Sequence, residues 1–378
     1  MDVKQVVINR STDFELQSIS LPAFEPDLVL IFGSTNKLRP GDAVRQLRER
    51  FPKTIFFGCS TAGEIAGTNV YDDSIVINFI QFESTRIAFS KIDSSKFHDS
   101  YTAGMKLGSN LEKRGLKHVF VLSDGLKVNG SELVAGLKSV FKDGVSITGG
   151  LAGDGGDMIE TLIIGNDLPE SGIIALIGFY GEGMDIKFGS FGGWDTFGPD
   201  RLITKSEKNV LYEMDGKSAL DLYKTYLGDH AKGLPATGLL FPLRLKLNEK
   251  DNGIVRTVLS VNEEEKSMTF AGNLPEGGYV RLMKANIDRL VDGAIEAAKI
   301  SADAKTKAPD FAILISCVGR KMVMKQRVEE ETEGVNEVLG NCIQSGFYSY
   351  GEISPFNPGV ECQLHNQTMT ITTFTEKP

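Results

Sequence analysis

The sequence predicts an α/β protein, or an α+β protein with mixed sheets, whose two domains are built from repeated strand–helix–strand–turn–strand units. Apolar runs of strand length alternate with segments of helical periodicity, and this order occurs three times along the chain. A chain of 378 residues is also longer than one compact core usually accommodates, so two domains are expected.

The first copy of the unit begins with residues 27–34, DLVLIFGS, which have the pattern of a buried strand. Residues 42–51 follow with apolar side chains at helical spacing. Residues 53–65, KTIFFGCSTAGEI, predict a strand that opens into a Gly-rich turn, and residues 73–82 predict the closing strand after a polar turn.

Two further copies follow the same order, each preceded by a helix. The second copy is expected to have its strand, helix, strand and closing strand at 117–125, 131–141, 145–156 and 172–181, after a helix at 101–115. The third is expected to have them at 310–320, 328–340, 342–353 and 367–374, after a helix at 286–301. The three central turns read Ala62-Gly63-Glu64, Ala152-Gly153-Asp154 and Tyr350-Gly351-Glu352.

The domain boundary is predicted just before a short helix expected at 218–228. The region between the second and third copies, roughly residues 183–283, is richer in strand patterns than the rest of the chain. We therefore divide the chain into a lead segment (1–26), an N-terminal domain (27–216) and a C-terminal domain (217–378).

Composition and charge limit the classes of function. The net charge of −9, without a long basic run, argues against nucleic-acid binding as the main task. The N-terminus lacks a signal-peptide pattern and the apolar stretches are too short to cross a bilayer, so membrane insertion is not expected. Four cysteines without a CxxC pair favour a reduced, cytoplasmic compartment, where each thiol is expected to be a small buried hydrophobe.

Polar side chains follow the predicted strands, at the edge where ligands collect in α/β sheets. The densest cluster is LSDGLKVNGSEL, residues 122–133, in which Ser123, Asp124 and Asn129 could hold a polar ligand, while a Ser or Asn could cap the next helix. For Asp124, ligand contact and a turn-stabilising Asx bond remain alternatives. Residues 149–156, GGLAGDGG, lack the P-loop lysine and a following helix, so they predict a tight turn rather than a nucleotide site.

Residues 362–368, CQLHNQT, bring His365 and Asn366 together near the end of the chain. Cys362 lies three residues before the histidine, but no second pair completes a zinc site, so no metal site is predicted. The single tryptophan, Trp194, could stack on a ligand or be half-buried packing.

Several of these blocks, in this order, resemble the FIST family of bacterial sensory proteins. The resemblance rests on GCSTAGEI, LSDGLKVNGSEL, ITGGLAGDGG, NVLYEMDGKSALDLYKTYLG, FAGNLPEGGYVRLM, and the ending GFYSYGEISP followed by CQLHNQTMTITTF. It runs from about residue 27 to residue 374 and covers the N-terminal and C-terminal domains of the family. It implies an intracellular signal-input module that binds a small ligand such as an amino acid.

The resemblance also suggests an output partner and a cofactor. Because no kinase, cyclase or coiled-coil segment is left over outside the two domains, we expect output through a separate protein, such as a histidine kinase or a diguanylate cyclase. One branch of the family is described as binding haem and sensing nitric oxide. His365 would be the haem ligand because it lies in a family motif, although no CxxCH attachment sequence is present. An enzyme with Cys59 or Ser123 as nucleophile is a third hypothesis, without an identifiable base nearby in the sequence.

The ligand is expected where the three turns converge, with Glu64, Glu352 or Asp154 accepting from a cationic amino group. For Glu64 and Glu352 the alternative is architectural, as caps of backbone N–H groups at the interface between copies. The candidate ligand-binding residues are Ser34, Cys59, Ser60, Thr61, Glu64, Ser123, Asp124, Asn129, Gly150, Asp154, Trp194, Tyr350, Glu352, His365 and Asn366.

Overall fold

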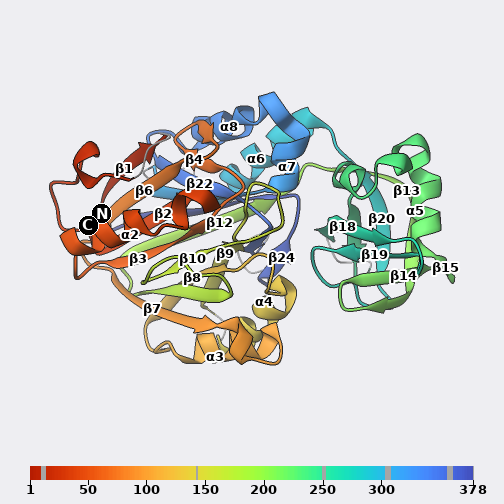
Figure 1. Cartoon of the computed structure of the whole chain (residues 1–378), viewed down its shortest axis with the longest axis horizontal. Coiled ribbons are helices and arrows are strands. Elements are labelled where there is room, and N and C mark those ends of the chain that lie inside the picture. The colour runs from red at the N-terminus through yellow and green to blue at the C-terminus, as the bar shows by residue number, and fades with distance from the viewer. Residues whose placement is uncertain (10–13, 142–143, 249–252, 303–307, 356–360, 378) are drawn as a thin grey trace.

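In the computed structural model, the chain folds into a body of three sheets and a smaller β-rich lobe (Figure 1). The structure describes residues 1–9, 14–141, 144–248, 253–302, 308–355 and 361–377. The two termini lie side by side at the end of the body opposite the lobe, where the Met1 amino group is 3.2 Å from Glu376 Oε2.

Each sheet of the body is built around one copy of the predicted repeat. The first sheet has the order β1 (Asp2–Ile8), β6 (Ile75–Gln81), β2 (Leu28–Gly33), β3 (Ile55–Ser60) and β10 (Ile163–Gly165). The second has the order β24 (Gln363–His365), β23 (Gly351–Ser354), β9 (Ser146–Leu151), β8 (Leu116–Ser123), β11 (Ile173–Tyr180) and β7 (Arg86–Asp93). The third has the order β12 (Met184–Phe191), β25 (Met369–Glu376), β21 (Phe311–Cys317), β22 (Ile343–Ser349), β4 (Glu64–Ala66) and β5 (Asn69–Tyr71).

Each copy contributes a parallel pair of strands and an antiparallel closing strand to its own sheet. The parallel pairs are β2–β3, β8–β9 and β21–β22, and the closing strands are β6, β11 and β25. The predicted repeat and the predicted mixed sheets are therefore confirmed.

The copies also exchange strands in a cycle. The strand that follows the turn of the first copy, β4, pairs with β22 of the third copy. The corresponding strand of the third copy, β23, pairs with β9 of the second, and β10 of the second pairs with β3 of the first. The three copies are thereby joined into one unit, which places the ends of their parallel strands close together.

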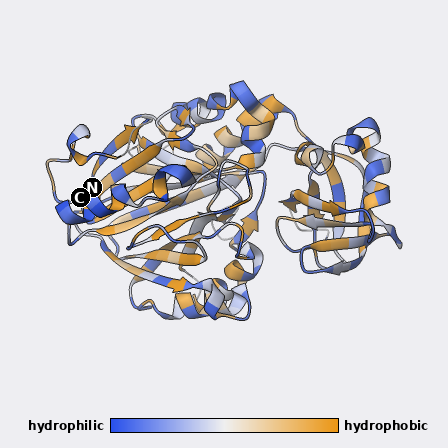
Figure 2. Cartoon of the chain, in the orientation of Figure 1, coloured by the Kyte–Doolittle hydropathy of each residue, from blue (hydrophilic) through white to orange (hydrophobic). Residues whose placement is uncertain are grey.

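Both faces of the central strands of the body are buried. In β2, Leu28, Leu30 and Phe32 belong to a core that all three sheets share, whereas Val29 and Ile31 pack on the side of helix α2 (Asp42–Arg50). In Figure 2 the body strands are mostly hydrophobic, whereas the outer helices alternate between hydrophobic and hydrophilic residues, as expected for helices with one face on a core. The other helices of the body are α1 (Thr35–Leu38), α3 (Ser100–Ser109), α4 (Gly130–Val140), α6 (Ile287–Ser301), α7 (Val318–Met324) and α8 (Glu329–Leu339).

The lobe is a curled antiparallel sheet with one α-helix, α5 (Ala219–Leu227), which has its own core. Its strands have the order β17 (Ile254–Arg256), β16 (Leu243–Lys246), β20 (Tyr279–Lys284), β13 (Asp195–Glu207), β14 (Val210–Met214), β19 (Ser267–Phe270) and β18 (Val258–Asn262), and β15 (Lys217–Ser218) pairs with β14. The boundary predicted between residues 216 and 217 falls inside this sheet, at the turn between β14 and β15. Of the helices that the structure describes, none is long and apolar enough to cross a membrane.

Candidate functional site

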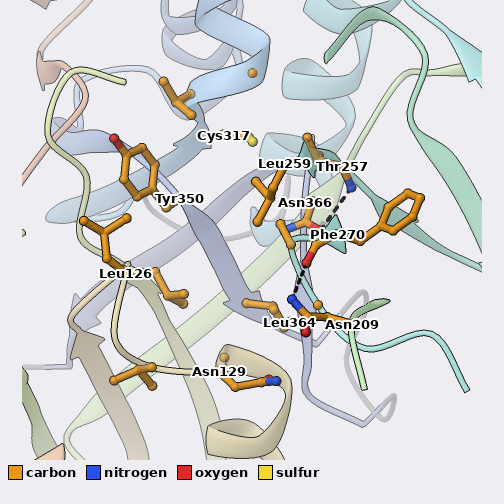
Figure 3. A pocket seen from close by; sticks show the side chains of 18 of the residues that line it. Leu126, Asn129, Asn209, Thr257, Leu259, Phe270, Cys317, Tyr350, Leu364 and Asn366 are labelled. Carbon is orange, nitrogen blue, oxygen red and sulfur yellow. Dashed lines mark hydrogen bonds between the residues drawn. The ribbon is translucent and has the colours of Figure 1, made fainter. Parts of the chain in front are cut away.

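A cavity of about 330 Å³ lies between the body and the lobe, and we call it the interlobe cavity (Figure 3). The body lines it with residues 125–130, Leu151, Met158, residues 317–319, Tyr350, Leu364 and Asn366. The lobe lines it with Asn209, Leu239, Thr257, Leu259 and residues 270–272. Three of the predicted site residues, Asn129, Tyr350 and Asn366, are among them.

The loop at residues 125–130 is held in place by an Asp before it and an Asn near its end. Asp124 Oδ1 accepts from the N–H groups of Leu126 and Lys127, both at 2.8 Å, which are the Asx bonds that the sequence left as an alternative. Asn129 Oδ1 accepts from the N–H groups of Ser131 and Glu132 and so caps helix α4. Local sequence therefore holds this part of the cavity wall in place.

The segment at residues 365–368 of the body forms hydrogen bonds with the lobe and with Trp194 beside it. Asn366 Oδ1 lies 3.5 Å from the N–H of Thr257 in the lobe. The carbonyl of Gln367 accepts from Trp194 Nε1 at 2.9 Å, and the Gln367 side chain donates to the carbonyl of Leu239 at 3.4 Å. Trp194 is buried and does not line the cavity, so in this structure it packs in the interior and does not stack on a ligand there.

The glutamates of the first and third turns make the same set of bonds. Glu64 Oε2 accepts from the N–H and Oγ of Ser74, directly before β6, at 3.1 and 2.6 Å. Glu352 Oε2 accepts from the N–H and Oγ1 of Thr368, directly before β25, at 3.1 and 2.9 Å. In both turns a hydroxyl three residues before the glutamate donates to its other oxygen. Each buried carboxyl group thus ties its turn to the closing strand of its own copy.

The second copy departs from this plan, because Asp154 is not in the position of the two glutamates. Its post-turn strand, β10, begins only at Ile163, after a longer loop. Asp154 accepts from three N–H groups of that loop and from the Tyr350 hydroxyl. Asp124 makes the tie to the closing strand instead, since its Oδ2 accepts from the N–H of Gly172 at 2.7 Å, directly before β11.

A second cavity, of about 350 Å³, has six acidic residues among the fifteen that line it, and we call it the acidic cavity. It contains four of the predicted site residues, namely Ser34, Thr61, Glu64 and Asp154. Its other lining residues are Thr35, Asn36, Arg39, Ala62, Gly63, Asp72, Asp73, Gly155, Asp157, Ile159 and Glu160. Among the described residues, no group of three or more His, Cys, Asp and Glu side chains is arranged to hold a metal ion.

The remaining predicted residues line neither cavity. They are Cys59, Ser60, Ser123, Asp124, Gly150, Trp194, Glu352 and His365. Burial raises the pKa of the Cys59 thiol, and Ser123 Oγ donates to the carbonyl of Asp124, so neither side chain is an activated nucleophile in this structure.

The geometry of His365 does not fit a haem bound in the interlobe cavity. The ring is fully buried, and its Nε2 lies 2.7 Å from the carbonyl oxygen of Ser354 inside the body. Burial lowers the pKa of His365 to about 4, so the ring is neutral at pH 7. A neutral imidazole can ligate iron, but this one faces a carbonyl rather than the cavity.

Sequence reasoning missed the lobe side of the cavity, notably Thr257, Leu259 and Phe270. The block FAGNLPEGGYVRLM contains Phe270 and contributes to the family resemblance, but it does not indicate which of its residues face a cavity. Thr257 lies between β17 and β18 and Leu259 lies in β18, and nothing in the run IVRTVLSV marks either position as facing a cavity.

Replacing Glu352 with Gln should make stability less dependent on pH. Burial raises the pKa of Glu352 to about 8, although hydrogen bonds from Ser349 and Thr368 oppose the shift. The folded state therefore binds more protons than the unfolded chain between about pH 4.5 and pH 8, so this carboxyl stabilises the fold most at the acidic end and loses its effect as pH rises.

Urea unfolding of the wild type and Glu352→Gln at about pH 5 and about pH 8 measures this contribution. The difference in free energy of unfolding, variant minus wild type, should be larger at about pH 8 than at about pH 5. Parallel pH profiles would contradict the shift.

Comparison with known proteins gives the family. Residues 27–217 match the FIST N domain and residues 219–355 match the FIST C domain. The chain is 23% identical, over 327 residues, to uncharacterized protein MJ1623 of Methanocaldococcus jannaschii. The matched region covers 79% of this chain but only 61% of the length of that relative. Among solved structures, a cyanuric acid hydrolase from A. caulinodans matches with a TM-score of 0.38 and a chorismatase with 0.35, each at 8% identity. The match to the hydrolase covers 100% of this chain and 99% of the hydrolase chain. The match to the chorismatase covers 98% of each chain.

FIST domains are sensory domains that bind small ligands in signalling. The two domain matches follow one another and together span most of the sequence. The chain therefore belongs to the FIST family of sensory proteins.

Proposed function

We propose that the chain is a sensor that binds one small molecule in the interlobe cavity. The observation that supports this most is the composition of the cavity wall, which combines residues from the strand ends of the second and third copies with residues of the lobe. Ligand sites collect at the ends of parallel strands and between domains. The cavity also falls within the usual size range of small-molecule sites, roughly 300–1,000 Å³.

Binding in this cavity would change how the lobe sits on the body. The ligand would touch the loop at residues 125–130 on one side and Leu259 on the other, so it would favour the arrangement in which both are close. The lobe is joined to the body through Gly192 and Gly193 at one end and through Ala285 at the other. A small rotation there would change the surface that an output protein contacts.

We further propose that the output is a separate cytoplasmic protein, such as a histidine kinase or a diguanylate cyclase. The support for this is membership of a sensory family. Haem-based sensing of nitric oxide is the alternative, and it would require His365 to leave its place beside Ser354. Adding hemin to the purified chain distinguishes the two, because a haem protein must show an absorption spectrum that differs from that of free hemin and changes in His365→Ala.

Thermal-shift measurements against a panel of metabolites test ligand binding in the cavity. A true ligand at 100 times its Kd should stabilise the fold by about 2.7 kcal/mol. Leu259→Trp should abolish the shift, because Leu259 lines the cavity and is 41% exposed, so a larger side chain can obstruct the cavity without disturbing the core. Leu247→Trp, an exposed position of the lobe that does not line the cavity, is the matched control and should bind normally.

Two results would contradict the proposal. One is the absence of any stabilising compound across the panel. The other is a ligand that stabilises Leu259→Trp as strongly as it stabilises the wild type and Leu247→Trp, because such a ligand would bind elsewhere.

A further inference from the structure

We infer that the ligand of the interlobe cavity is an uncharged molecule with an apolar body, and that it donates a hydrogen bond to Asn209 Oδ1. This inference rests on the proposed function, because it names the ligand class of the same cavity. It differs from the amino acid that the family resemblance implied, because an amino acid carries both an ammonium and a carboxylate group at pH 7.

The first observation is that the open surface of the cavity is mostly apolar on both sides. Leu126 and Met158 of the body are 37% and 48% exposed, and Leu259 of the lobe is 41% exposed. Tyr350 and Leu364 add further apolar surface, as Figure 3 shows. An engineered cavity of about 150 Å³ holds benzene, so this cavity, at about 330 Å³, has room for a body of one or two rings.

The second observation is the lack of charged partners for a ligand. No Asp, Glu, Arg or His is among the described residues that line the cavity. Lys127 is the one charged lining residue, and it is exposed, with its Cδ 3.8 Å from the Cβ position of Gly172 on the side of a separate surface depression. A charged group on the ligand would therefore lose hydration in the cavity without gaining a partner of opposite charge.

The charged groups behind the wall already bind other atoms. Asp124 accepts from the N–H groups of Leu126 and Lys127 and, with its other oxygen, from that of Gly172. The guanidinium of Arg256 donates to backbone carbonyls and fills the space beside Gly272, whose Cβ position is 2.9 Å from its Cζ. Neither charge lines the cavity, so neither offers a ligand a salt bridge.

The third observation is a hydrogen-bond acceptor on the lobe side of the cavity. Asn209 Nδ2 donates to the carbonyl oxygen of Phe270 at 2.9 Å, as a dashed line in Figure 3 shows. This bond fixes the orientation of the amide, because the reverse orientation would bring two acceptor oxygens together. In the part of the chain that the structure describes, Oδ1 accepts from no residue and is not enclosed. Since Asn209 is a half-buried lining residue, this oxygen is available to a ligand donor.

The other amides and hydroxyls of the described lining are either bonded or enclosed. Asn129 uses both ends of its amide, on helix α4 and on the lobe, and the Tyr350 hydroxyl donates to a carboxylate. Asn366 is 1% exposed, and its Nδ2 donates to a backbone carbonyl at 3.0 Å. Thr257 Oγ1 has no partner, but it is buried within the wall. Asn209 is therefore the side chain on which the polar group of the ligand is expected.

The test uses probes that share one body and differ in charge or in a single donor. The N-methylamide and the methyl ester of 3-phenylpropanoic acid are both uncharged and similar in shape, and only the N-methylamide has an N–H group. Calorimetry on the full chain compares them with 3-phenylpropanoate, 3-phenylpropylamine and phenylalanine. The N-methylamide should bind about threefold to tenfold more tightly than the ester, because it adds one neutral hydrogen bond. It should bind at least about tenfold more tightly than each charged probe.

Three variants assign these preferences to the cavity wall. Asn209→Leu should bind the N-methylamide and the ester equally, because it has no acceptor, and its affinity for the ester should be that of the wild type. Asn262→Leu is the matched control, because Asn262 lies in β18 of the same lobe and does not line the cavity, so the preference should persist. Leu126→Glu adds a carboxylate at an exposed lining position and should raise the affinity for 3-phenylpropylamine by about threefold.

The outcomes separate the two proposals. If a charged probe binds as tightly as the N-methylamide, and Leu259→Trp blocks it, the sensor proposal stands and the inference of an uncharged ligand is overturned. Equal binding of the N-methylamide and the ester to the wild type, or a preference that survives Asn209→Leu, overturns the role of Asn209. If no probe binds, the proposed function fails together with the inference. Should Asn209→Leu not fold, the comparison of the probes in the wild type decides alone.

Discussion

Replacing Arg320 with Met should lower the free energy of unfolding by about 3–5 kcal/mol, because it leaves a carboxylate buried without its partner. Arg320 and Glu331 are both fully buried, and Arg320 Nη2 lies 2.7 Å from Glu331 Oε2. The other oxygen of Glu331 accepts from Ser316 Oγ at 2.9 Å and from the Tyr348 hydroxyl at 2.7 Å. Urea unfolding followed by circular dichroism measures the loss.

The same arginine bonds to both segments that connect the lobe to the body. Its Nη1 donates to the carbonyl of Gly192, just before the lobe begins, and its Nη2 donates to the carbonyl of Leu290, just after the lobe ends. We therefore expect Arg320→Met to increase amide hydrogen exchange around both positions even under conditions where the body stays folded. This local effect separates a role at the lobe junction from general destabilisation.

Two further variants serve as controls for Arg320. The double variant Arg320→Met/Glu331→Gln should be more stable than Arg320→Met, because Gln still accepts from Tyr348 without carrying an unpaired charge. Arg327→Met removes an arginine that forms ion pairs at the surface, and it should change stability little. An Arg320→Met protein as stable as the Arg327→Met protein would refute the role of the buried pair.

Much of the body could be predicted from the sequence, because both faces of its central strands are buried and local patterns mark them. The run at 27–34 and the helix at 42–51 appear as β2 and α2 with shifts of one residue. The strand expected at 310–320 ends earlier, since β21 stops at Cys317 and α7 begins at Val318. The apolar run continues across that junction, so periodicity does not reveal where strand becomes helix.

The cyclic exchange of strands could not be predicted, because it depends on contacts between residues that lie roughly one hundred to three hundred positions apart. Ile65 in β4 pairs with Gly346 in β22, and nothing near either residue in the sequence specifies that partner. The lead segment likewise gave no sign that β1 would pair with β6. Local patterns predict strands, whereas the partners of short strands follow from the assembled sheets.

The candidate site was only partly accessible to sequence reasoning. Asn129, Tyr350 and Asn366 could be found because they lie in distinctive turns. Thr257 and Leu259 could not, because nothing in the run IVRTVLSV marks either residue as facing a cavity. They line it only because the lobe packs against the body.

Gly346→Ala should cost more than about 3 kcal/mol and could prevent folding, because the repeat leaves no room for a methyl group at this position. A Cβ on Gly346 would lie 1.8 Å from the carbonyl oxygen of Leu314, its partner in the parallel strand. The equivalent glycines of the other copies are in the same situation: Gly58 would meet the Ile31 carbonyl and Gly149 the Val121 carbonyl, each at 1.8 Å. The obstacle is backbone in every case, so no side-chain rotation can relieve it.

The three glycines also lie where the copies exchange strands. Gly58, Gly149 and Gly346 lie opposite Ile164, Ile353 and Ile65, the isoleucines of the exchanged strands. Gly58→Ala, Gly149→Ala and Gly346→Ala should therefore be similarly damaging, although they lie far apart in the sequence. Gly340→Ala is the control, because that glycine has φ of 67° and open space around it, so only the backbone strain of about 1–2 kcal/mol remains. If Gly346→Ala proved no worse than Gly340→Ala in urea unfolding, the close approach of the parallel strands would not be what requires glycine, and the shared first residue of GCSTAGEI and GFYSYGEI would need another cause.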